Sequence, residues 1–154
     1  MKKIFAAGIV AGLVMMLVGT LVDKTFMYLF PFLVDEYKNA ALFRPWSDPR
    51  MWLFFVQPYF LGIVLAWIWS KTRTDWRVIS VFERGVLFGL VYWLLVLPGM
   101  LVTYASFAVS GIMVSNWILM AGFQAVCAGV VFSFMLKEGL KDKFNLQAKK
   151  INKK

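Results

Sequence analysis

Four polar side chains stand out because they lie inside long apolar runs, where each could bind a ligand or a neighbouring helix: Gln57, Tyr59, Tyr92 and Gln124. Counted inward from the ends of the runs, three of them fall near the middle of a bilayer, and Gln57 falls about 6 Å above it at 1.5 Å per residue. In one interpretation they line a cavity for an amphipathic or neutral ligand. The favoured interpretation is hydrogen bonding between helices, which is common in membrane proteins.

A second candidate site is the charged segment before the second apolar run, which contains Arg44, Asp48 and Arg50. An arginine there could bind an anionic ligand or pair with a nearby carboxylate. Asp48 followed by Pro49 is also the usual start of a helix, with Asp as the N-cap and Pro as the first helical residue. This structural interpretation explains most of the residue choices and is favoured.

Residues 42–49 read LFRPWSDP. This loop and the sequence around it, from about 20 to 72, resemble a group of uncharacterised small bacterial and archaeal integral membrane proteins with an LFRPWSDP-like external loop. That group has no assigned activity, so the resemblance implies a membrane protein and no particular chemistry.

Several kinds of chemistry are excluded by residue type. The chain has no His and a single Cys, Cys127, which excludes a His/Cys zinc site, a disulfide framework and a His-based catalytic triad. No charged residue lies inside an apolar run, so proton-coupled transport lacks its usual titrating group. We therefore expect no enzymatic activity, metal or cofactor. An enzyme using the external residues Asp35, Glu36, Arg44 and Asp48 is the weakest hypothesis.

Composition indicates the class of protein that positions these residues. Of 154 residues, 61% are hydrophobic, 18% are aromatic and only 16% are charged, with a mean hydropathy of +0.72. Soluble domains are nearer half apolar and a quarter charged. The composition excludes a disordered chain, a coiled coil and an ordinary soluble domain, and it indicates a membrane protein.

The charge-free runs predict an all-α bundle of four transmembrane helices, at about 4–22, 51–70, 85–107 and 113–136, because a span needs roughly 20 apolar residues. The last two share one uncharged run, which we expect to turn within 105–116, with Pro98-Gly99 as a kink. The first run follows Lys2 and Lys3 as in a secretory signal peptide. It is long and lacks an A-x-A cleavage site, so we expect it to remain as a span.

Basic residues predict the topology. Four spans place both termini on one side, and that side holds 13 of the 17 Lys and Arg residues. The positive-inside rule then predicts an inner-membrane protein with both termini in the cytoplasm. Residues 1–136 form the transmembrane domain, and 137–154 form a basic amphipathic tail. We expect the tail to bind anionic lipid of the inner leaflet, rather than nucleic acid, through Lys141, Lys143, Lys149, Lys150, Lys153 and Lys154.

Small residues recur at helical spacing on three spans and predict close helix packing. The stripes are Gly8, Gly12 and Gly19; Gly85, Gly89 and Gly99; and Ser115, Gly122 and Gly129. Gln124 lies about 200° around its helix from the last stripe. We expect it to face outward and pair with Gln124 of a second chain; the alternative turns it inward to Tyr92 or Gln57.

Two functions follow from these patterns. The first is a non-enzymatic accessory or scaffold subunit that associates with itself or with a larger membrane complex. The alternative is a small homo-oligomeric transporter or channel for an amphipathic or neutral ligand. A polar cavity joining Gln57 and Gln124 would favour the transporter, and a packed bundle would favour the scaffold.

Overall fold

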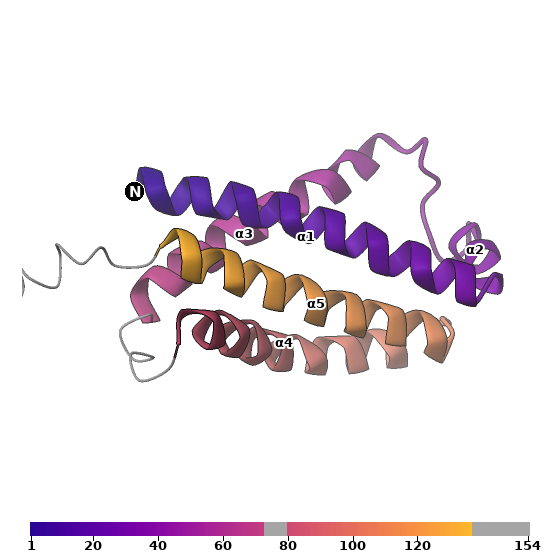
Figure 1. Cartoon of the computed structure of the whole chain (residues 1–154). Coiled ribbons are helices and arrows are strands. Elements are labelled where there is room, and N and C mark those ends of the chain that lie inside the picture. The colour runs from indigo at the N-terminus through magenta and orange to yellow at the C-terminus, as the bar shows by residue number, and fades with distance from the viewer. Residues whose placement is uncertain (73–79, 137–154) are drawn as a thin grey trace, which may run out of the picture.

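Four long helices make up most of the computed structural model, which describes residues 1–72 and 80–136. They are α1 (Lys2–Leu29), α3 (Trp52–Thr72), α4 (Val81–Ser106) and α5 (Gly111–Met135). A short helix α2 (Phe32–Tyr37) and a 3₁₀ turn η1 (Pro49–Met51) lie between α1 and α3. The described part of the chain contains no strand, so the predicted all-α fold is confirmed (Figure 1).

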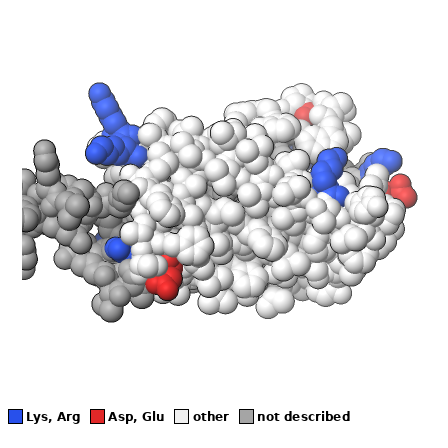
Figure 2. All heavy atoms as spheres, viewed as in Figure 1, with Lys and Arg blue, Asp and Glu red and all other residues white. Residues whose placement is uncertain are grey.

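All four long helices are long and apolar enough to cross a membrane. On the face drawn in Figure 2, charged side chains gather toward the two ends, and a broad uncharged band separates them. Such a band matches the hydrocarbon core of a bilayer. The chain is therefore a multi-pass membrane protein, with its N-terminus and the end of α5 at the same end of the bundle (Figure 1).

The helix boundaries differ from the predicted spans mainly in α1, which continues through Asp23 and Lys24 to Leu29 instead of ending near residue 22. The turn between the last two spans lies at 107–110, inside the predicted interval, and α4 runs through Pro98. The predicted lipid-binding tail, 137–154, lies outside the described residues.

Glycines set the packing of the helices. α1 packs on α3 where Gly8 and Gly12 meet Gly62: a Cβ at Gly12 would lie 2.6 Å from the Cα of Tyr59. α4 packs on α5 in the same way, since a Cβ at Gly85 would lie 2.7 Å from the carbonyl oxygen of Gly129. Because α1 also packs along α5, the order across the bundle is α3, α1, α5, α4.

α3 joins the bundle over only part of its length. Its buried residues run from Pro58 to Trp69, and Trp69 packs edge-on against Phe88 in a core shared with α1, α4 and α5. Toward its beginning α3 diverges from the other helices (Figure 1). All six residues from Trp52 to Gln57 are exposed, so no other long helix of the described chain covers this half of α3.

Candidate functional site

The end of the bundle that carries α2 holds a hydrogen-bond network around the carboxylate of Asp23. Asn116 on α5 donates to Asp23 Oδ1 at 2.9 Å, and the Tyr37 hydroxyl on α2 donates to the same oxygen at 3.2 Å. The indole of Trp117 donates to the Tyr37 hydroxyl at 2.8 Å. Asn116 is fully buried. The network therefore joins α1, α2 and α5 in a water-poor setting, where such hydrogen bonds are strong.

A second carboxylate joins α2 to α5. Glu36 accepts hydrogen bonds from both the backbone N–H and the hydroxyl of Ser110, the latter at 2.7 Å. Ser110 is the N-cap of α5, and its hydroxyl oxygen accepts a bond from the Met113 N–H. A negative charge is stabilised at this position because the helix dipole is positive at the N-terminus. Glu36 and Asp23 thus hold α2 over the end of the bundle.

Burial raises the pKa of Tyr37 to about 12, against an ordinary value of 10.0; the hydrogen bond from Trp117 opposes this rise and the charge of Asp23 adds to it. Because the pKa of Tyr37 is higher in the folded than in the unfolded state, the neutral hydroxyl contributes to the free energy of unfolding. This contribution is complete below pH 10 and is lost as the pH rises through about 12.

We expect the tyrosinate absorbance of the wild type, minus that of Tyr37→Phe, to titrate with a midpoint near pH 12 in detergent solution. The pH titration of both proteins at 295 nm measures it. A difference curve centred near the ordinary tyrosine pKa would contradict the burial of this hydroxyl.

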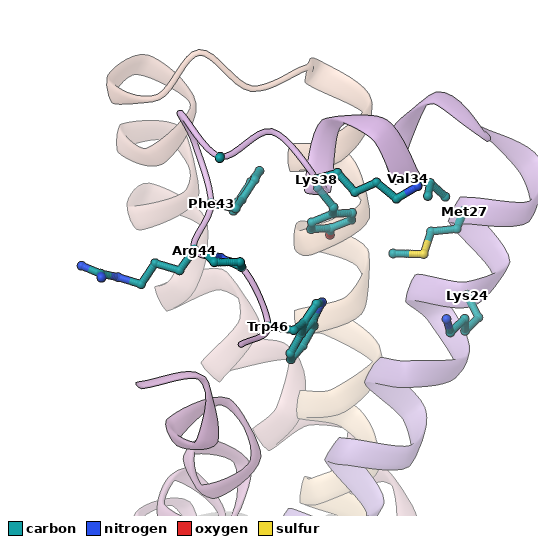
Figure 3. Close-up of a pocket in the computed structure, with 10 residues that line it drawn as sticks. Lys24, Met27, Val34, Lys38, Phe43, Arg44 and Trp46 are labelled. Carbon is teal, nitrogen blue, oxygen red and sulfur yellow. The ribbon is translucent and has the colours of Figure 1, made fainter. Parts of the chain in front are cut away.

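Next to this network lies a cavity of about 400 Å³ between α1, α2 and the loop that follows α2. Figure 3 shows Lys24 and Met27 reaching it from α1, and Val34 and Lys38 from α2 and its end. The loop closes the other side with aromatic and small residues. The complete lining is Lys24, Met27, Val34, Tyr37, Lys38, Ala40, Phe43, Arg44, Pro45 and Trp46.

Arg44 and Asp48, predicted as an anion site or a helix start, bind each other. Arg44 donates to Asp48 Oδ2 at 3.0 Å, and its guanidinium points away from the cavity (Figure 3). Asp48 caps the turn η1 by accepting from the N–H of Arg50 at 2.8 Å. These bonds hold the pKa of Asp48 below its ordinary value. The capping interpretation is confirmed, and both oxygens of Asp48 are occupied.

The residues predicted to lie near the middle of the bilayer have separate surroundings. Gln124 donates to the carbonyl oxygen of Met15 on α1 at 2.9 Å, beside Gly19. The prediction that Gln124 faces outward is therefore wrong: α5 lies between α1 and α4 and packs on both. Tyr59 on α3 has its hydroxyl 4.0 Å from the sulfur of Met16, and Tyr92 packs against the shared core.

Gln57 differs from the other three, because it is exposed on the diverging half of α3. Within one chain Gln57 therefore neither lies in a cavity nor bonds to a neighbouring described helix, whereas the two interpretations of the sequence expected one or the other. Among the described residues the side-chain amide of Gln57 has no hydrogen-bond partner. Pro58, the next residue, is buried, and its carbonyl oxygen lies against Gly12 on α1. The structure thus leaves one unpaired amide on the apolar surface of a spanning helix.

The sequence analysis does not predict the hydrogen bond between Asp23 and Asn116, although the position of Asp23 in the sequence indicates that it faces the other helices. Asp23 follows Gly12 and Gly19 at helical spacing, so it continues the small-residue face that α1 turns toward its neighbours. Asn116 lay in the segment expected to turn, and the helix that contains it begins earlier, at Gly111. Within the described ranges, no group of three or more His, Cys, Asp or Glu could hold a metal ion.

Comparison of the chain with protein-family models, with curated proteins and with solved structures finds no match. The resemblance of residues 42–49 to small membrane proteins stays a prediction. Fold, burial and charge are therefore the basis for assigning a function.

Proposed function

We propose that the protein is a non-enzymatic scaffold subunit of the membrane that self-associates through the diverging half of α3. The observation that carries this proposal is the exposed amide of Gln57, which has no hydrogen-bond partner in the part of the chain that the structure describes. An amide left unpaired in hydrocarbon costs several kcal/mol on apolar-solvent scales. A protein partner at this position would supply the missing hydrogen bonds.

The surroundings of Gln57 form a surface suited to another helix. Leu53, Gln57, Phe60 and Val64 follow one another at spacings of four, three and four, and all are exposed. This is the a/d pattern along which two helices interlock, and a single polar residue at such a position fixes the register of the pair. We call these four residues the α3 stripe.

The occupant that fits the α3 stripe best is a second copy of this chain. Two copies inserted with the same topology hold their α3 helices parallel and place Gln57 at the same depth in the bilayer. An amide both donates and accepts, so two Gln57 side chains can pair reciprocally across a two-fold axis. The sequence predicted a homodimer through Gln124, but Gln124 has its partner within the chain. We therefore place the homodimer interface on α3 instead.

A polar cavity joining Gln57 and Gln124 would favour the alternative, a small homo-oligomeric transporter or channel. Gln124 is bound to α1, whereas Gln57 is exposed on α3. Because the two amides lie apart, their positions support the scaffold function rather than this alternative.

The test is native mass spectrometry in mild detergent. We expect a two-chain mass for the wild type and a dissociation constant raised roughly 5- to 30-fold in Gln57→Leu, since such hydrogen bonds contribute about 1–2 kcal/mol in membranes. The matched control Gln124→Leu removes an internal bond and should keep the dimer. A wild-type monomer, or a dimer lost only in Gln124→Leu, would show that the proposed interface is wrong.

A further inference from the structure

We propose that the cavity beside α2 binds the headgroup of an anionic phospholipid from the leaflet at that end of the bundle. The site lies within one chain and is distinct from the α3 stripe. Its lining combines two ammonium groups with apolar and aromatic side chains, which is the chemistry that an amphipathic anion requires.

The positive charge comes from Lys24 and Lys38. Lys24 forms no ion pair within the described ranges of the chain. Lys38 has only a long contact of 3.9 Å with Asp35, between side chains that are 72% and 87% exposed. Such surface pairs contribute little and exchange readily. Both ammonium groups are therefore available to a phosphate, whereas Arg44 is engaged by Asp48.

The depth of Lys24 fits a lipid headgroup. Lys24 follows Lys3 by 21 residues on the single helix α1, which corresponds to about 32 Å at 1.5 Å per residue. The hydrocarbon core of a bilayer is about 30 Å thick, so Lys24 lies at its boundary when Lys3 lies at the other. A phosphate beside Lys24 would be at the level where phospholipids carry theirs.

The size and walls of the cavity favour a lipid over a soluble anion. A volume of about 400 Å³ accommodates a glycerophosphate headgroup and the first carbons of its chains, but not whole acyl chains. Met27, Val34 and Trp46 supply apolar wall around this space (Figure 3). The acyl chains can continue over the exposed apolar surface of the spans, where Phe54 and Phe55 pack beside Trp46.

Native mass spectrometry of the protein titrated with phosphatidylglycerol or phosphatidylcholine tests this site. We expect one phosphatidylglycerol to bind more tightly than phosphatidylcholine. Lys24→Gln and Lys38→Gln should each weaken phosphatidylglycerol about fivefold, because a lysine near a lipid surface contributes about that factor. Lys71→Gln, an equal charge change on the last turn of α3, should leave the affinity unchanged.

Two further arms separate the alternatives. Ala40→Leu adds bulk to the cavity wall without changing charge, and it should also weaken the binding of phosphatidylglycerol. Gln57→Leu should bind phosphatidylglycerol as the wild type does, whether or not this variant forms a dimer. Equal binding of the two lipids, equal loss in Lys71→Gln, or no loss in Lys24→Gln and Lys38→Gln would overturn the proposal. So would displacement of the lipid by soluble glycerol phosphate at equal concentration, which would indicate a soluble anion as ligand.

Discussion

Replacing Gly85 by alanine is expected to disturb the packing of α4 on α5 and to lower the free energy of unfolding. The new Cβ would lie 2.7 Å from both the carbonyl oxygen of Gly129 and the Cα of Val130. Both are backbone atoms, which cannot rotate away as a flexible side chain can. Overpacking of this kind costs about 1–3 kcal/mol and occasionally more, and we expect Gly85→Ala at the upper end. Equilibrium unfolding in mixed detergent and SDS micelles measures the loss.

Gly99 offers a matched control on the same helix. A Cβ at Gly99 meets nothing within 4 Å, so Gly99→Ala adds the same methyl group without a clash. Alanine is favoured over glycine inside a helix by about 1 kcal/mol, and the control should be neutral or slightly more stable. Equal destabilisation by the two substitutions would contradict the α4–α5 contact described above.

The second large effect is expected from Asp23→Leu. This change removes the acceptor shared by Asn116 and Tyr37, and the Asn116 side chain is fully buried. Each buried donor left unpaired costs about 1–3 kcal/mol. We expect a lower free energy of unfolding and faster proteolysis within 30–48, because α2 loses one of its two polar attachments.

Asp35→Leu is the control for this prediction. Asp35 lies on the same short helix as Tyr37, but its carboxylate is exposed. Its one ion pair within the described residues is a long contact of 3.9 Å with Lys38. An exposed ion pair contributes little, so stability and proteolysis should stay near the wild-type values. If Asp35→Leu and Asp23→Leu behaved alike, the network around Asp23 would not be what holds α2.

The fold follows from local features of the sequence. Charge-free runs predict the four spans, and the turn at 107–110 lies within the predicted interval 105–116. The cap at Asp48 was equally predictable, because an N-cap depends on residues only two or three apart in the chain. These features need no knowledge of which helix packs on which.

The candidate sites depend on the order of the helices, which periodicity within one helix does not contain. Gln124 is internal because α1 inserts beside α5, and Gln57 is external because it precedes the crossing of α3 and α1 at Gly62, in the half of α3 that diverges. That crossing is set by backbone contacts between two helices. The cavity joins Lys24, Lys38 and Trp46 from three segments, so only the tertiary structure brings it together.

Disulfide crosslinking in native membranes tests self-association through the α3 stripe most directly. In a Cys127→Ser background, Leu53→Cys places a thiol on the stripe and keeps Gln57, while Phe55→Cys places one about 200° around the helix from Gln57. Both positions are exposed, at 52% and 55%. We expect mild oxidation to give a covalent dimer for Leu53→Cys but not for Phe55→Cys, and to give a lower yield of that dimer when Gln57→Leu is added to Leu53→Cys. Crosslinking of Phe55→Cys as efficiently as Leu53→Cys, or no crosslinking of Leu53→Cys, would contradict the proposed dimer.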